Sequence, residues 1–195
     1  ESDTFDGACF LAGTRIATPL GERAIELLAP GDLILTAGGR AVPVRFVGRQ
    51  RVLTAFGLAK RSLPVRIRAG ALGDGLPKRD LVLTGEHALL IDELLINAAA
   101  LVNGESIDWV PLREFHGSYT VYNVETEDHD VLLAEGVPAE TFIDYVDRAA
   151  FDNYQEYLDR YGEDRTISEM SFPRISAGRL VPANLKSRFA GTRAA

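Results

Sequence analysis

The chain has 195 residues, of which 46% are hydrophobic and 25% charged, a balance typical of a globular domain and not of disordered, collagen-like or coiled-coil chains. Its net charge of −7 argues against nucleic acid as the main partner. No apolar run approaches the ~20 residues that a membrane-spanning helix needs. The single cysteine, Cys9, excludes an internal disulfide and a cysteine-rich zinc site.

Short β-type runs separated by turn residues fill the chain from about residue 10 to 142. They predict strands at residues 14–18, 32–36, 42–47, 63–68, 81–83, 88–91, 120–124 and 131–133. Within this part, only residues 22–28 are typical of one or two helical turns. Many short strands with frequent turns predict an all-β architecture, either closed or sandwich-like.

The pattern changes after Phe142. Apolar and aromatic residues recur at spacings of three and four from 142 to 161, which predicts an amphipathic helix that ends near Gly162. Beyond Glu169 the chain has five bases and no acid, so this basic tail carries +5, and the other 16 bases and 28 acids leave −12 on the rest. We expect the tail to lie across the acidic body, in preference to a membrane or polyanion.

Three features can carry chemistry: Cys9, Thr84-Gly-Glu-His87, and the stretch from Asn123 to His129. Taken singly, each has an ordinary structural explanation. A lone cysteine is most often a small buried hydrophobe, a lone histidine a hydrogen-bonded structural residue, and clustered acids solvate a turn. Their order along one chain of short strands is what favours a functional interpretation.

In that order the three features resemble a Hint domain, the autoprocessing module shared by hedgehog precursors and inteins. The run from Cys9 to Thr18 resembles the family's opening, Thr84-Gly-Glu-His87 its T-x-x-H motif, and residues 122–137 its C-terminal motif. The resemblance covers residues 9 to about 142, and the ending is similar to that of a bacterial Hint subgroup. It implies a compact, horseshoe-like Hint fold in three parts: an upstream segment (1–8), the Hint domain (9–142), and a helical and basic C-terminal extension (143–195).

The resemblance implies an N–S acyl shift at the Ala8–Cys9 peptide bond. The Cys9 thiol would attack the Ala8 carbonyl and form a thioester of residues 1–8, with help in losing its proton because a free cysteine has a pKa near ~8.5. His87 would be the general acid for the leaving nitrogen, and we expect its imidazole to lie close to the sulfur. The Thr84 hydroxyl would polarise or hold the bond.

The C-terminal motif implies further roles and departs from the intein pattern. His129 matches the second family histidine and is a candidate proton relay. Inteins commonly have an aspartate where Asn123 stands, and since an amide is no base, that role passes to Asp128 or is absent. Splicing also needs a His-Asn pair where this chain has Glu140 and Thr141.

The resemblance therefore implies N-terminal cleavage or transfer without splicing. Water, a thiol, an alcohol or an amine would resolve the thioester, with the chain's own upstream polypeptide as substrate. No cofactor is implied, and three histidines without close pairing give no metal-ligand spacing. The chain begins with Glu1, and its first residues do not resemble a signal peptide, which indicates a processed chain or a piece of a longer one. The bacterial relatives favour a secreted or cell-surface location.

Two other function classes remain open. A catalytically inert Hint-like domain would serve as an interaction module and leave the Ala8–Cys9 bond intact. A cysteine hydrolase acting in trans would use Cys9 and His87 as a dyad and needs an open cleft. The aromatic stripe from 142 to 161 can likewise recruit an acceptor or pack on the domain, and we favour packing.

Overall fold

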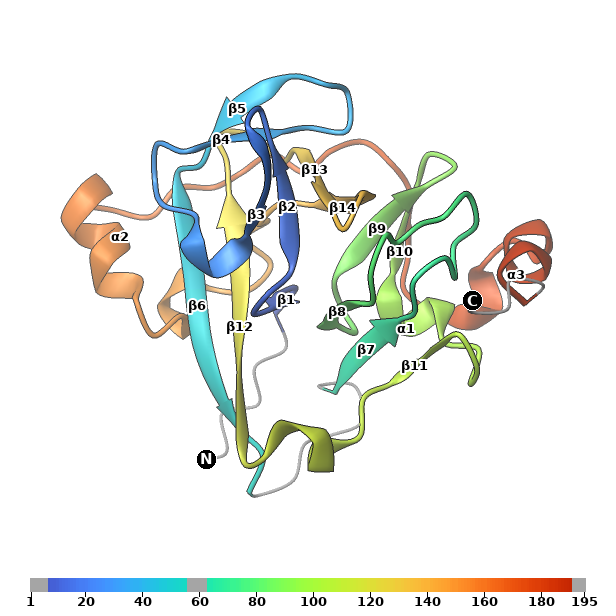
Figure 1. Ribbon diagram of the computed structural model, residues 1–195. Coiled ribbons are helices and arrows are strands. Elements are labelled where there is room, and N and C mark those ends of the chain that lie inside the picture. The colour runs from blue at the N-terminus through green and yellow to red at the C-terminus, as the bar shows by residue number, and fades with distance from the viewer. Residues whose placement is uncertain (1–6, 56–62, 191–195) are drawn as a thin grey trace.

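The computed structural model describes residues 7–55 and 63–190, mostly as short strands in three sheets (Figure 1). This confirms the all-β prediction. The first sheet has six strands, in the spatial order β11 (Ile107–Trp109), β7 (Pro64–Ile67), β8 (Leu81–Thr84), β1 (Phe10–Leu11), β12 (Ser118–Glu125) and β6 (Phe46–Leu53).

The second sheet has seven strands, in the order β15 (Arg174–Ile175), β10 (Leu94–Asn97), β9 (Ala88–Ile91), β14 (Val137–Glu140), β13 (Val131–Ala134), β2 (Arg15–Thr18) and β3 (Gly21–Ala24). The strands β4 (Leu33–Leu35) and β5 (Ala41–Pro43) form a separate pair. The pairings are antiparallel except that of β10 with β15.

The helical elements are short. The α-helices are α1 (Ala98–Leu101), α2 (Tyr154–Tyr161) and α3 (Ala183–Ala190), and the 3₁₀ turns are η1 (Ile25–Leu27), η3 (Leu112–Phe115), η4 (Arg148–Ala150) and η5 (Gly178–Leu180). Within the described parts of the chain, no helix has the length and apolar character to cross a lipid bilayer.

Two hydrophobic clusters stabilise these layers. The larger one joins both large sheets and includes the fully buried Phe10 and Leu83 of the first and Ile16 and Leu89 of the second. The smaller one, here called the second cluster, joins the first sheet to the C-terminal extension; its buried members are Cys9, Phe46, Tyr119, Val121, Phe142, Ile143, Phe151, Tyr157 and Ile167. Phe151 and Tyr157 of the extension thus pack on the domain, whereas Tyr145 is exposed.

The predicted helix over residues 142–161 is wrong in its first half, since α2 begins only at Tyr154. Just before α2, Asp152 and Asn153 form hydrogen bonds with the backbone of β6, on the edge of this last strand that no other strand of the first sheet pairs with. The Arg49 amide donates to Asn153 Oδ1 (2.9 Å), and the Arg51 amide donates to Asp152 Oδ2 (2.8 Å). Asn153 Nδ2 in turn donates to the Val47 carbonyl (2.9 Å). Satisfying a strand edge outweighs the helical spacing of the sequence.

Two other expectations changed. Residues 22–24 of the stretch predicted to be helical belong to β3 and pair with β2, which leaves only the 3₁₀ turn η1 from that stretch. The basic tail, for which no element was predicted, forms β15 and α3. It lies against acidic residues as expected: Arg174 pairs with Glu140 (2.6 Å) and Arg188 with Asp92 (3.3 Å). The last base, Arg193, is outside the described residues.

A buried ion pair also fastens the extension to the domain. Glu125, at the end of β12, is 1% exposed and receives two hydrogen bonds from Arg148, at 2.7 and 3.0 Å. Arg165 adds a third at 3.1 Å. Such paired, charge-assisted bonds compensate the cost of burying the carboxylate.

The contact between β6 and the extension predicts the effect of Gly48→Ala. A Cβ at residue 48 would lie 2.7 Å from the Phe151 ring, so the ring must shift and the free energy of unfolding should fall by roughly 1–3 kcal/mol. Urea denaturation measures this. Gly38→Ala is the matched control, because its Cβ meets only Thr36 Oγ1 at 3.9 Å. Equal stability changes in the two variants would contradict the packing described here.

Candidate active site

The position of β1 between β8 and β12 brings distant parts of the chain to one peptide bond (Figure 1). Phe10 is paired with Leu83 on one side and with Tyr122 on the other. In an antiparallel register the preceding residue, Cys9, must then lie beside Thr84 and Asn123. The strand pairing alone therefore places these two predicted site residues at the Ala8–Cys9 bond.

Hydrogen bonds hold both polar atoms of that bond. Asn123 Nδ2 donates to the Ala8 carbonyl oxygen. The Cys9 amide donates to Thr84 Oγ1 (2.8 Å), and the Thr84 hydroxyl donates to the Gly7 carbonyl (2.8 Å). The Thr84 amide also donates to the Cys9 carbonyl (2.8 Å). The peptide is thus fixed in one orientation, with an amide donor on the oxygen where negative charge would develop during an attack.

The Cys9 side chain is fully buried in the second cluster. Burial in these surroundings raises the pKa of the thiol well above its ordinary value, because the thiolate would lose its hydration. The thiol is therefore protonated at neutral pH. No metal ligand set of three or more His, Cys, Asp or Glu side chains forms here or elsewhere in residues 7–55 and 63–190.

The His87 imidazole lies on the other side of β1. Its ring centroid is 4.1 Å from that of Phe10, and its Nε2 donates to the Glu140 carbonyl (3.0 Å). Burial lowers its pKa below the ordinary 6.5, an effect partly offset by the Glu140 carboxylate and by the backbone of Glu140 and Cys9. The ring is thus neutral, and its free Nδ1 has no hydrogen-bond partner among the described residues. The expected link between the imidazole and the thiol is not formed as a hydrogen bond.

His129 and Asp128 are not part of this group. His129 donates through Nε2 to Glu140 Oε2 (3.1 Å), and its Nδ1 accepts from the Met170 amide (3.1 Å). It reaches His87 only through Glu140. The Asp128 side chain is exposed, and only its backbone carbonyl is bonded, by Thr126 Oγ1 (2.8 Å).

Glu140 and Arg174 are the residues that the sequence analysis missed. Arg174 donates to both Glu140 oxygens, at 2.6 and 3.1 Å, and the Ala88 amide donates to one of them (2.9 Å). Burial alone would raise the pKa of Glu140, but the bonds from His129 and Arg174 lower it to about 2. A single acid at the end of a strand, and a base 34 residues later, carry no local sequence signal that would pair them.

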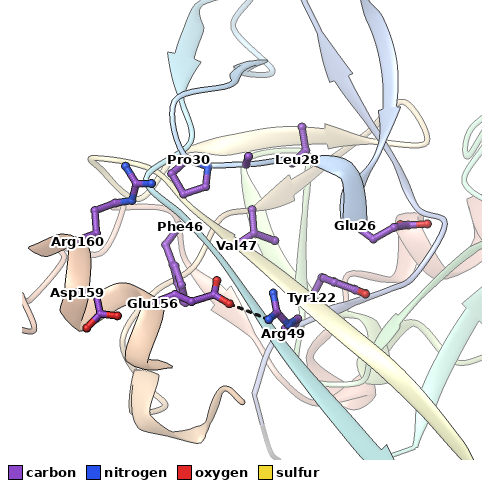
Figure 2. Close-up of a pocket in the computed structure, with 11 residues that line it drawn as sticks. Glu26, Leu28, Pro30, Phe46, Val47, Arg49, Tyr122, Glu156, Asp159 and Arg160 are labelled. Atoms are coloured by element: carbon purple, nitrogen blue, oxygen red, sulfur yellow. Dashed lines mark hydrogen bonds and ion pairs between the residues drawn. The ribbon is translucent and has the colours of Figure 1, made fainter. Parts of the chain in front are cut away.

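A separate hollow of about 690 Å³ lies between the first sheet and α2 (Figure 2). Figure 2 shows the Arg49–Glu156 ion pair (2.7 Å) beside an apolar wall that includes Phe46 and Val47. None of its lining residues belongs to the group around the Ala8–Cys9 bond.

The low pKa of Glu140 predicts a pH-dependent contribution to stability. An acid with a depressed folded-state pKa stabilises the fold above its ordinary pKa of 4.5, and this contribution is lost as the pH falls toward about 2. At neutral pH it is on the order of 3 kcal/mol. The difference in unfolding free energy between wild type and Glu140→Gln, measured in urea, should therefore shrink between pH 5 and 2.5. The exposed Glu163→Gln should show no such trend; a constant difference for Glu140→Gln would contradict the ion-pair network.

Comparison with known proteins places this geometry in a family. The family model described as "Hint domain" matches residues 8–146. No curated protein matches the chain by sequence.

Solved structures with a similar fold are inteins and an intein-like domain. A crystal structure of the MchDnaB-1 intein matches with a TM-score of 0.51 at 21% identity, covering 68% of this chain and 99% of that one. A DnaB intein from Synechocystis sp. PCC 6803 gives 0.50 at 13% identity, covering 70% and 99%. A bacterial intein-like domain from Clostridium thermocellum gives 0.50 at 17% identity, covering 69% and 98%.

At these identities the structural likeness concerns the fold. The family match extends over more than two thirds of the chain and includes Cys9, Thr84, His87 and Asn123. It supports self-processing as the general class of activity. The resemblance seen in the sequence is confirmed: the chain belongs to the Hint domain family.

Proposed function

We propose that this chain cleaves itself at the Ala8–Cys9 bond through an N–S acyl shift, and that an external nucleophile then releases residues 1–8. The observation that carries the proposal is the pair of contacts on that one peptide, Asn123 Nδ2 on its oxygen and Thr84 Oγ1 on its nitrogen. A carbonyl that already accepts a directed amide donor needs little reorganisation when its oxygen becomes negatively charged.

The attack itself is intramolecular. The Cys9 sulfur and the Ala8 carbonyl carbon are separated by three covalently linked atoms, so the attack closes a five-membered ring and has the advantage of a unimolecular step. The new S–C bond produces a tetrahedral oxyanion that the Asn123 amide stabilises. When the C–N bond breaks, the carbonyl re-forms as a thioester and Cys9 gains a free amine.

His87 is the group that would carry the Cys9 thiol proton to the leaving nitrogen. Its neutral ring carries the proton on Nε2, which donates to the Glu140 carbonyl, so Nδ1 is free to accept one. Burial keeps the thiol protonated and the imidazole neutral. Nδ1 has no bond to the thiol in the resting structure, so the two groups must first approach each other before the thiol proton can pass to Nδ1 and then to the leaving nitrogen. Glu140, held by Arg174 and His129, positions this ring; Asp128 has no role in the step.

The C-terminal end of the domain supports cleavage without splicing. At the positions where an intein needs its final His-Asn pair, Glu140 is held in ion pairs and Thr141 Oγ1 is bonded to the Asp130 backbone, at 2.9 and 3.1 Å. Neither side chain has an amide that can cyclise and cut the chain. A hydrolase acting in trans is disfavoured because the Cys9 thiol is fully buried and therefore out of reach of a second protein.

The proposed cleavage is tested by intact mass spectrometry after incubation with dithiothreitol. Wild type should lose residues 1–8. Cys9→Ala should lose nothing, and Asn123→Ala should slow release by about 10²–10³-fold, the usual effect of removing one oxyanion donor. The exposed Asn184→Ala is the matched amide control and should react like wild type. An unchanged mass for folded wild type would favour an inert interaction module.

The protonation states predict the pH dependence of release. A lowered His87 pKa means that the imidazole becomes protonated, and unable to accept the thiol proton, only below pH 6.5. Rates extrapolated to saturating dithiothreitol should therefore be level from pH 7 to 8 and decline as the pH falls below 6.5. His87→Ala should lack this acid limb and be slower throughout. An acid limb with its midpoint at or above pH 6.5 in wild type would contradict the assignment.

A further inference from the structure

We propose that the nucleophile which resolves the thioester enters a small cavity beside Ala8, and that this cavity selects small, positively charged nucleophiles. This inference rests on the proposed function. The cavity measures about 120 Å³, room for roughly four water-sized groups of ~30 Å³ each. Its walls include Ala8 and Asn123, the residue whose carbonyl the thiol would attack and the residue whose amide donates to that carbonyl.

The apolar part of the cavity suits a short carbon chain. Phe142, Ile143, Val146 and Phe151 line it, and three of them are buried members of the second cluster. These side chains are fixed by packing against the domain, so they do not move aside easily. The reacting end of a nucleophile, about four or five heavy atoms and thus one half of dithiothreitol, fits this space, whereas the bulk of a tripeptide or a lipid exceeds it.

The charged part of the cavity has an excess of negative charge. Its charged lining residues are Glu86, Glu140 and Arg174, and the Tyr145 hydroxyl, whose pKa is raised above its ordinary value by partial burial, is neutral. Arg174 is already paired with both oxygens of Glu140. Glu86 receives only an uncharged hydrogen bond, from Asn97 Nδ2 at 3.1 Å, and within the described residues no cation pairs with it. The remaining carboxylate attracts a cationic group and repels an anionic one.

A second, independent feature points to a ligand with a hydrogen-bond donor. Asn123 is 3% exposed, and while its Nδ2 donates to the Ala8 carbonyl, its Oδ1 has no hydrogen-bond partner in the described chain. Buried acceptors are normally satisfied. An incoming S–H or N–H group can donate to Oδ1, which would align it with the carbonyl bonded to the same amide.

The reaction at this place is a simple acyl exchange. For a thiol, a new bond forms between its sulfur and the Ala8 carbonyl carbon, and the bond from that carbon to Cys9 Sγ breaks. The proton of the incoming thiol ends on Cys9 Sγ. The products are a thioester of residues 1–8 with the small thiol and a chain that begins with the free amine of Cys9.

Three small thiols of similar size test the selection: cysteamine, which is cationic, thioglycolate, which is anionic, and neutral 2-mercaptoethanol. Release of residues 1–8 is followed by intact mass, and each rate is divided by that of 2-mercaptoethanol on the same variant. The ratio of cysteamine to thioglycolate should fall by on the order of tenfold in Glu86→Gln. The double ratio between variants removes the intrinsic reactivity of each thiol.

Glu105→Gln is the charge-matched control, since Glu105 is exposed and does not line the cavity; it should keep the wild-type ratio. A second measurement needs no mutation: raising the salt concentration to 0.5 M should lower the wild-type ratio by screening. A ratio that neither Glu86→Gln nor salt changes would overturn the cavity assignment and leave the proposed function standing. Failure of all three thiols to release residues 1–8 from wild type would overturn the proposed function itself.

Discussion

The pairing of β1 between β8 and β12 is the constraint on which the site depends. A strand of only two residues, Phe10 and Leu11, is hydrogen-bonded on both sides. Its register places the preceding peptide bond against Thr84 on one side and Asn123 on the other. Because β8 and β12 are themselves held by β7 and β6, the first sheet fixes the orientation of the Ala8–Cys9 bond.

The same burial that orders the site restrains its reactivity. The Cys9 sulfur lies in the second cluster, where the first sheet meets the C-terminal extension. Phe151 and Tyr157 of the extension pack there, and Arg148 lies over the Tyr157 ring while it pairs with Glu125. This contact between the first sheet and the extension excludes water from the thiol and so raises the pKa of Cys9. The extension therefore stabilises the domain and keeps the Cys9 thiol protonated.

The strands of the domain were predictable where polar and apolar residues alternate, as in β2 and β7, because a half-buried strand imposes that period. Strands β11 and β14 were not, because β11 has only three residues and the run of β14 does not alternate; pairing fixes them, with β7 for β11 and with β13 and β9 for β14. The helix over residues 142–153 failed for a related reason: Asp152 and Asn153 bond the edge of β6. A spacing that is compatible with a helix cannot show that a sheet edge elsewhere will compete for the same residues.

By itself the sequence determined the family, because Cys9, Thr84-Gly-Glu-His87 and the stretch around Asn123 follow one another in a fixed order. Only the tertiary structure decided how they are arranged. The fold places the Asn123 amide on the Ala8 oxygen and leaves the His87 imidazole without a hydrogen bond to the Cys9 sulfur. It also brings Glu140, paired with Arg174, against the His87 ring. The physical reason is that motif order reflects the covalent chain, whereas the direction of a hydrogen bond and the hydration of a thiol depend on side chains brought together from 34 to more than 100 residues away.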